Sequence, residues 1–341
     1  MRKTDKGKIL YFSSCGGGIL TYVKILKNYF EERGWETENV CGNKGITPPF
    51  FLKHCYNFNS FNFMKNLKKK IKDAGLVHLN IPCSSAELFI SKICRKYDVP
   101  LITTFHLALG NGIFSLPSYY GRLIINLQKS CKKFIFVSEY QKRKILGRKH
   151  LENSVVIEHG IDLKKYRKKK VERFFEGFTL GFLGRLDLEK NIFNLIKACK
   201  ELKVNLAIAG TGTLYEKVKK AENEHVKVLG FFKDEVYFYN AIDVYILPSY
   251  AEACVPFSVL EAMACETPII VSPIINIEGD FCVKMKGFGK EDIKKAILEM
   301  KDKFSKDLGK EARKVAVEKY SMERMLKQTE KVYEEALESR I

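Results

Sequence analysis

The sequence predicts an α/β protein built from two domains, each a parallel sheet covered by helices. The chain has 341 residues, which is long for one hydrophobic core. Short apolar runs alternate with longer segments of helical periodicity, first over residues 8–157 and again over residues 178–271. Such alternation is typical of parallel sheets, and its repetition predicts two Rossmann-like domains.

Each expected strand is a short run of apolar and β-branched residues. In the first half these runs cover residues 8–13, 76–80, 100–105, 134–137 and 154–157. In the second half they cover residues 178–183, 204–208, 226–229, 243–247 and 268–271. Apolar residues at helical spacing predict a helix from Ile19 to Phe30, ended by Gly34, and another between Ile192 and Leu202.

A charged segment without periodicity, Lys164–Arg173, is expected to link the two domains. The first domain would then cover residues 1–172 and the second residues 173–320. Residues 317–338 read as one long final helix, and we expect residues 321–341 to pack back on the first domain.

The net charge of +19 is unevenly distributed. Residues 1–172 contain 32 Lys and Arg against 13 Asp and Glu, whereas residues 173–341 contain 27 of each. One interpretation is an ordinary basic surface; the other is a first domain that faces an anionic membrane, a phosphorylated acceptor or nucleic acid. Nucleic acid is not expected, because no recognised module interleaves aromatic and basic residues.

We expect the protein to be cytoplasmic. No apolar run approaches the roughly 18–20 residues that span a membrane, and the brief apolar stretch near the N-terminus reads as the first strand. The ten cysteines are scattered, without CxxC or metal-type spacing, so we expect reduced and mostly buried thiols.

Residues 57–73 form an amphipathic segment with two open interpretations. Phe61, Met64, Leu67 and Ile71 share one helical face. The remaining positions are crowded with Lys65, Lys68, Lys69, Lys70 and Lys72. The segment is either a surface helix packed on its own sheet or a helix that docks on anionic lipid at the inner membrane face.

Three loops follow expected strands and carry candidate site residues. Gly16–Gly18 open the first helix, where backbone N–H groups can approach a sugar or a diphosphate, although the loop is neither a GxGxxG nor a P-loop motif. Residues 184–190 (GRLDLEK) place an Arg and a Lys where both can reach a diphosphate. Glu252 and Glu261 flank the loop and helix after the strand at 243–247.

Taken in order, GRLDLEK, AGTGTL, VKVLGFF, AIDVYILPS and EACVPFSVLEAMACETPIIVS resemble the donor domain of the retaining glycosyltransferases of family 4. The match is close over residues 178–272 and looser before them, through the GGG loop, VPLITTFH, FVSEYQKR and VIEHGID. The resemblance implies a GT-B fold, in which two Rossmann-like domains face a central cleft. It also implies an acceptor-binding first domain and a second domain that binds a nucleotide sugar.

The resemblance also implies roles for individual residues. Arg185 and Lys190 would hold the donor diphosphate, Glu252 and His106 would contact the transferred sugar, and Glu261 would bind the ribose. The positions that match donor-binding residues of the family are Gly17, Gly18, Gly210, Gly212, Gly230, Phe231, Pro256, Phe257, Ser258 and Glu261. The positions that match its catalytic residues are His106, Arg185, Lys190 and Glu252.

One departure concerns the spacing of the two glutamates. Eight residues separate Glu252 from Glu261, where the family has seven, and an insertion around Cys254–Val255 is the simplest account. Because of this extra residue, the orientation of the Glu252 side chain toward the sugar does not follow directly from the family.

The implied reaction retains the anomeric configuration through an oxocarbenium-like state. The basic pair would stabilise the leaving diphosphate, so neither a metal ion nor a cofactor is expected. The donor is expected to be a UDP-sugar rather than a GDP-sugar, on family frequency, and the acceptor a saccharide, a lipid or a lipid-linked saccharide. The alternatives are a sugar-nucleotide epimerase of the same architecture and a catalytically silent or nucleic-acid-binding protein.

Overall fold

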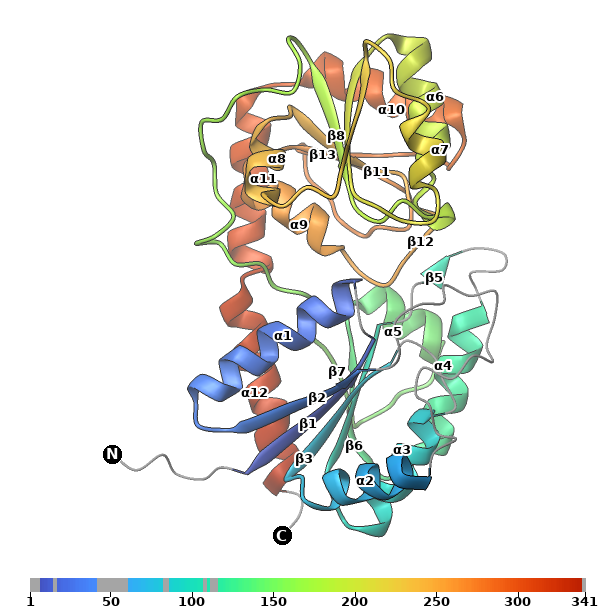
Figure 1. The fold of residues 1–341 in the computed structure, drawn as a ribbon, viewed down its shortest axis with the longest axis vertical. Coiled ribbons are helices and arrows are strands. Elements are labelled where there is room, and N and C mark those ends of the chain that lie inside the picture. Colours follow the sequence, from blue (N-terminus) through green and yellow to red (C-terminus); the bar gives the residue numbers. More distant parts are fainter. Residues whose placement is uncertain are drawn as a thin grey trace. The chain divides into compact units, whose positions relative to one another are not determined.

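The computed structural model describes residues 7–14, 17–41, 61–81, 86–106, 109–110 and 116–338. It divides the chain into two compact units (Figure 1), which are described separately here. The first unit contains the chain up to Glu158 together with residues from Met325 onward. The second unit covers His159–Arg324.

The first unit is a parallel six-stranded sheet with helices on both faces (Figure 1). Its strand order is β2-β1-β3-β4-β6-β7. The strands are β1 (Lys8–Ser13), β2 (Glu36–Cys41), β3 (Leu76–Ile81), β4 (Leu101–Phe105), β6 (Cys131–Phe136) and β7 (Ser154–Val156); a short β5 (Leu109–Gly110) follows β4. The helices are α1 (Gly17–Glu32), α2 (Phe61–Lys72), α3 (Ala86–Lys96), α4 (Leu116–Leu127), α5 (Glu139–Leu146) and most of α12 (Met322–Glu338).

The second unit repeats this architecture with the strand order β10-β9-β8-β11-β13-β14. Its strands are β8 (Thr179–Leu183), β9 (Asn205–Ala209), β10 (Val226–Gly230), β11 (Val244–Leu247), β13 (Ile269–Val271) and β14 (Cys282–Lys284); a short β12 (Ala251–Glu252) follows β11. The helices are η2 (Leu188–Lys190), α6 (Ile192–Leu202), α7 (Tyr215–Lys219), α8 (Glu235–Asn240), α9 (Phe257–Ala264), α10 (Lys290–Lys303) and α11 (Lys306–Lys319).

The predicted fold class, two Rossmann-like domains with parallel sheets, is confirmed. The ten expected strands all form, but the sequence prediction missed β2 and β14, which lie at the edges of their sheets. The first helix ends at Glu32, and Gly34 adopts a positive φ of 87° directly after it. A residue without a Cβ adopts this conformation at little cost, which explains the stop.

The prediction of one helix over residues 317–338 is wrong. α11 ends at Lys319 and α12 begins at Met322. Between them the backbone pairs with Ile161, whose N–H donates to the Tyr320 carbonyl (2.7 Å) and whose carbonyl accepts from Met322 N–H (3.1 Å). These bonds take backbone groups that a continuous helix would use internally, so the chain breaks there.

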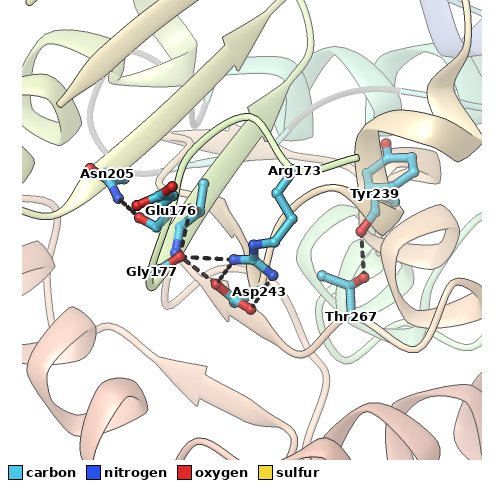
Figure 2. Close-up of polar contacts among 8 residues, drawn as sticks. Arg173, Glu176, Gly177, Asn205, Tyr239, Asp243 and Thr267 are labelled. Atoms are coloured by element: carbon cyan, nitrogen blue, oxygen red, sulfur yellow. Dashed lines mark hydrogen bonds and ion pairs between the residues drawn. The ribbon is translucent and has the colours of Figure 1, made fainter. Parts of the chain in front are cut away.

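The charged segment at 164–173 belongs to the second unit, so the boundary falls after Glu158 and not after Glu172. Tyr166 is buried in that unit's core, and the Lys169 N–H donates to Asn240 Oδ1 at 2.8 Å. Figure 2 shows how Arg173 reaches Asp243: its Nη1 donates to Oδ1 at 3.0 Å, and its Nη2 donates to the Gly177 carbonyl at 2.9 Å. These contacts tie the segment to the sheet that follows it.

Helix α12 packs into the first unit through aromatic and polar contacts. The ring of Tyr333 stacks on Phe30 with 4.6 Å between ring centroids, and its hydroxyl lies 2.6 Å from Nδ1 of the fully buried His78. Tyr29 donates to Glu330 at 2.7 Å. Burial lowers the pKa of His78 to about 3, so its ring is neutral and its partners are hydroxyl groups.

We predict that Asp243→Ala destabilises the second unit more than Arg173→Ala does. The Asp243 carboxylate accepts from the Thr179 N–H (2.8 Å) as well as from Arg173, so its loss strands a backbone donor and a guanidinium. We expect a loss of about 1–3 kcal/mol for Asp243→Ala and about 0–1 kcal/mol for Arg173→Ala, measured by calorimetric unfolding. Asp302→Ala, on the exposed side of α10, is the matched control. Equal losses for the first two variants would contradict this ranking.

Candidate active site

The candidate residues of the second unit gather at one edge of its sheet. Because the strands are parallel, their carboxyl ends and the loops that follow lie together, where ligands bind in sheets of this type. Arg185 follows β8, Gly210 follows β9, Gly230 ends β10, and Glu252 comes after β11. The sheet topology therefore brings these predicted residues to one side of the unit.

Gly210 and Gly212 let these loops touch each other. A Cβ on Gly210 would lie 1.8 Å from the Gly184 carbonyl oxygen, and one on Gly212 would lie 2.6 Å from the Leu186 carbonyl oxygen. Backbone hydrogen bonds run between the same loops, from Leu186 N–H to the Thr211 carbonyl and from Gly210 N–H to the Gly230 carbonyl. These glycines shape the edge through close backbone contact, and Phe231 beside it leaves 79% of its surface exposed.

Arg185 is held by two carboxylates close to it in the sequence. It pairs with Asp187 and with Glu189, while its side chain stays half exposed. Asp187 is buried and also accepts from the Thr213 N–H (2.9 Å) and hydroxyl (2.8 Å). These hydrogen bonds help to keep the pKa of Asp187 below its ordinary value, so it remains a carboxylate. Asp187, which the sequence prediction passed over, orients the guanidinium.

Lys190 and Glu252 form an ion pair. Lys190 Nζ lies 2.6 Å from Glu252 Oε1, and both side chains are mostly buried. Lys190 comes from the short helix η2 and Glu252 from strand β12. The sequence prediction assigned Lys190 to the diphosphate and Glu252 to the sugar. The structure brings Lys190 and Glu252 together. Lys190 thus pairs with a carboxylate, as Arg185 does.

The loop with the extra residue is irregular where the insertion was expected. Ala253–Val255 form bends between β12 and α9. Cys254 Sγ lies 3.3 Å from His159 Nδ1, and His159 stacks on Phe257 with 4.5 Å between ring centroids. Burial lowers the pKa of His159 to about 4, so the ring is neutral. The Phe257 side chain thus packs on His159, which leaves its backbone as the part that can serve a ligand.

Helix α9 begins at this loop with a proline before it. Pro256 occupies the N-cap position, and its side chain makes no capping hydrogen bond. The first N–H groups of a helix have no partner within the helix, and together with the helix dipole they favour an anion. The backbone of Phe257 and Ser258 is therefore a suitable place for a phosphate group.

Glu261 lies one turn into α9 and is held by a tyrosine that the sequence did not reveal. Tyr239, fully buried on α8, donates from its hydroxyl to Glu261 Oε2 at 2.7 Å. Figure 2 shows the backbone of Tyr239 fixed in turn by the Thr267 hydroxyl at 2.9 Å. Burial raises the pKa of Glu261 to about 7 despite this hydrogen bond. The carboxyl group of Glu261 is therefore fixed in position, and its ionisation is less favourable than that of an exposed glutamate.

In the first unit, His106 follows β4 and is held by Asn80 at the end of β3. His106 Nε2 lies 3.2 Å from Asn80 Oδ1, and the ring of Tyr22 meets it edge-on at 4.9 Å between centroids. The Asn80 Nδ2 donates to the His78 carbonyl at 3.4 Å, which orients the amide so that its oxygen faces His106. An amide oxygen accepts only, so Nε2 carries the ring proton.

Gly17 and Gly18 begin α1, which follows β1 in the same sheet. Gly17 has a φ of 70° and both residues are exposed. Gly16, from the same motif, lies outside the described residues. Because β1 and β4 flank β3, this helix start, Asn80 and His106 lie at the carboxyl edge of one sheet.

The lysines of the amphipathic segment lie on α2, and Lys65, Lys68, Lys69, Lys70 and Lys72 are all exposed. Leu67 and Ile71 are buried in the core of the unit, and the side chains of Phe61 and Met64 lie outside the description. Lys70 pairs with Glu38 on β2. The described apolar residues of α2 are therefore covered by the unit's own sheet.

The described residues show neither a metal-binding cluster nor a membrane-spanning helix. These residues contain no group of three or more His, Cys, Asp or Glu side chains arranged to hold a metal ion. None of their helices is both long and apolar enough to cross a bilayer.

Comparison with known families covers most of the chain. Residues 164–315 match the family described as glycosyl transferases group 1, and residues 16–165 match the family described as glycosyltransferase family 4. The chain carries both glycosyltransferase domains. The group 1 domain contains Arg185, Lys190, Glu252 and Glu261, and the family 4 domain contains His106.

Curated glycosyltransferases match much of the chain at low identity. The uncharacterized glycosyltransferase MJ1178 of Methanocaldococcus jannaschii is 28% identical over 299 residues, which are 82% of this chain and 80% of the relative. The capsular polysaccharide biosynthesis glycosyltransferase CapM of Staphylococcus aureus is 25% identical over 58% of this chain and 60% of its own length.

Solved structures show the same two-domain fold. HepE of Anabaena, in complex with UDP and glucose, superposes with a TM-score of 0.75 at 16% identity, over 96% of this chain and 99% of that chain. A glycosyltransferase of Rickettsia africae superposes with a TM-score of 0.74 at 18% identity, over 98% of this chain and 99% of that chain.

We predict that Glu261→Gln stabilises the folded chain at pH 8. The folded-state pKa of about 7 lies above the ordinary value of 4.5, so folding takes up a proton between these values and stability falls as pH rises through 7. A glutamine at this position cannot ionise, so the unfolding free energy of the variant should exceed that of the wild type by about 1–3 kcal/mol at pH 8. The difference should shrink toward pH 5, as measured by calorimetry. A gap that is constant across this range would contradict the raised pKa.

We predict that Asn80 fixes the tautomer of His106. In the wild type, nitrogen NMR of the imidazole should show a single tautomer protonated at Nε2, because Asn80 Oδ1 only accepts. Asn80→Leu removes that acceptor and should let the ring proton exchange between Nε2 and Nδ1. His225 in the second unit, whose Nδ1 lies 3.2 Å from Asn205 Oδ1, should be unaffected and serves as the internal control. A wild-type His106 that already exchanges would refute the assignment.

Proposed function

We propose that the chain transfers a sugar from a UDP-sugar to a saccharide or lipid-linked saccharide acceptor, with retention of the anomeric configuration. The observation that carries this proposal is the Lys190–Glu252 ion pair, set beside Arg185 and the open start of α9 at one edge of the donor-binding sheet. This edge offers two cations and backbone N–H groups to a diphosphate, and a carboxylate to the sugar next to it.

Each group has a defined task in the proposed reaction. The α9 N-terminus and Arg185 would hold the diphosphate, and Glu261 would accept hydrogen bonds from the ribose. When the donor binds, its phosphate would compete with Glu252 for Lys190 and release the carboxylate toward hydroxyl groups of the sugar. The basic pair, rather than a metal ion, would then neutralise the negative charge that develops as the bond from the sugar to the diphosphate breaks.

For His106, the role that the family resemblance implies is contact with the transferred sugar. Asn80 orients the imidazole ring through the hydrogen bond from Nε2–H to Oδ1. The choice of UDP is supported by HepE, which is described with UDP, with UDP and glucose, and with UDP-glucose. CapM, described as acting in capsular polysaccharide biosynthesis, supports a saccharide acceptor.

The proposal is tested first with a donor panel. UDP-, GDP- and TDP-sugars are incubated with the chain, and release of the nucleoside diphosphate identifies the donor. Reaction with lipid-linked and free saccharide acceptors then identifies the acceptor class, and proton NMR of the product gives the anomeric configuration. Release of GDP alone would refute the choice of nucleotide, and an inverted product would refute retention.

We predict that Lys190→Ala lowers kcat by roughly 10²–10³-fold but weakens donor binding by less than about tenfold. The reason is that its charge acts mainly on the departing diphosphate. Steady-state kinetics and titration calorimetry with the active donor measure the two effects. Lys200→Ala, exposed on α6, is the control, and calorimetric unfolding checks that each variant is folded. Equal losses in kcat and affinity would contradict a role in the transition state.

A further inference from the structure

Helix α4 of the first unit exposes an apolar stripe to solvent. Tyr119, Leu123 and Leu127 are 66%, 49% and 52% exposed. They are four residues apart, so they lie along one face of the helix. Among the first-unit residues whose side chains the structure describes, the exposed large hydrophobic residues all belong to this stripe.

The other side of α4 is firmly packed, so the stripe does not result from a loosely held helix. Ile124 is fully buried in the core, and a Cβ on Gly121 would lie 3.1 Å from the side chain of Ile145. Arg122 Nε donates to the Ile145 carbonyl and ties α4 to α5. α4 has the sequence LPSYYGRLIINL, with Arg122 as its one charged residue. The exposed side of α4 thus carries Tyr119, Leu123 and Leu127 beside the polar Arg122 and Asn126.

The surroundings of the stripe are strongly basic. Residues 116–150, which contain α4 and α5, include nine Lys and Arg but only one acidic residue, Glu139. The basic residues at the end of α5 and just after it are exposed, namely Arg143, Lys144, Arg148 and Lys149. Figure 1 shows α5 beside α4 in the first unit. The apolar stripe therefore lies on a helix whose neighbour, α5, is rich in exposed basic residues.

We propose that α4 and α5 dock the chain on the surface of an anionic lipid bilayer. Tyr119, Leu123 and Leu127 enter the interfacial layer, and the basic residues of α5 contact the headgroups. An amphipathic phenol ring suits the water–lipid boundary, and each nearby Lys or Arg adds about a factor of five to binding of an anionic membrane. These three side chains form a narrow apolar stripe close to exposed basic residues. This combination suits an anionic bilayer, whose surface is negatively charged and yields to inserted side chains.

This docking surface differs from the one that the sequence indicated. On α2 the lysines are exposed, but Leu67 and Ile71 are buried, so the described part of that helix offers charge without apolar side chains. Helix α4 supplies exposed apolar side chains, and the adjoining α5 supplies exposed basic residues. These are the two features of an interfacial membrane-binding surface. The proposal does not depend on the proposed sugar transfer.

The full chain is tested by co-sedimentation with vesicles of phosphatidylcholine, with and without phosphatidylglycerol. The wild type should sediment with the anionic vesicles and lose binding as salt rises. Leu123→Ser/Leu127→Ser should lower the partition coefficient at least about tenfold, because two leucine side chains lose their burial in lipid. The matched control is Leu298→Ser/Val317→Ser, which removes two exposed apolar residues of the second unit and should bind like the wild type.

A fluorescent reporter then locates the contact. Trp35 is the single tryptophan, so Trp35→Phe/Tyr119→Trp places the only indole on the stripe. Its emission should shift to the blue with anionic vesicles and be quenched by brominated lipid. Calorimetric unfolding shows whether each variant is folded, and the reporter variant tests the same contact without removing a leucine.

Several outcomes would overturn the proposal. Equal sedimentation with neutral vesicles, or an equal loss in the control variant, would exclude specific docking through α4. Loss of binding on Lys65→Ala/Lys68→Ala/Lys69→Ala with no effect of the α4 variant would assign the contact to α2. A dimer in light scattering that Leu123→Ser/Leu127→Ser dissociates, without vesicle binding, would assign the stripe to a second copy of the chain.

Discussion

Parallel pairing of strands is the constraint on which the candidate site depends. In each unit all six strands of the sheet run in one direction, so every loop that follows a strand emerges at the same edge. Residues as distant in sequence as Arg185 and Glu252 therefore come to one place. Gly210 and Gly212 then permit backbone approaches that a Cβ would prevent, and Asp187 links the loop after β8 to the loop after β9. Close contact among the loops thus turns a shared edge into a shaped site.

The strands and the main site positions could be predicted because both leave local signals. Buried parallel strands read as short apolar runs, and the motif residues stand directly after them. The two missed strands, β2 (ETENVC) and β14 (CVK), lie at sheet edges, where polar or short sequences suffice. The break at Tyr320–Ser321 depends on Ile161, which lies far away in the sequence, so periodicity alone extended the helix.

The partners of the site residues could not be predicted for the same reason. Tyr239 beneath Glu261, and Asn80 beside His106, are chosen by the fold and not by spacing. Their effect is nevertheless chemical: one holds a buried carboxyl whose pKa is about 7, and the other decides which imidazole nitrogen holds the proton.

Charge is organised differently in the two units. In the second unit, His159–Arg324, 30 Lys and Arg stand against 25 Asp and Glu, and the two candidate catalytic cations pair with Asp187, Glu189 and Glu252. The Lys190–Glu252 pair avoids the cost of a mostly buried, unpaired cation. In the proposed reaction, a phosphate of the donor would replace Glu252 as the partner of Lys190. The first unit carries most of the excess positive charge, and its helix α4 also exposes apolar side chains. Internal pairing thus suits the proposed binding of a small anionic donor, whereas an excess of positive surface charge suits the proposed docking on an anionic membrane. The two charge patterns lie in separate units of the chain.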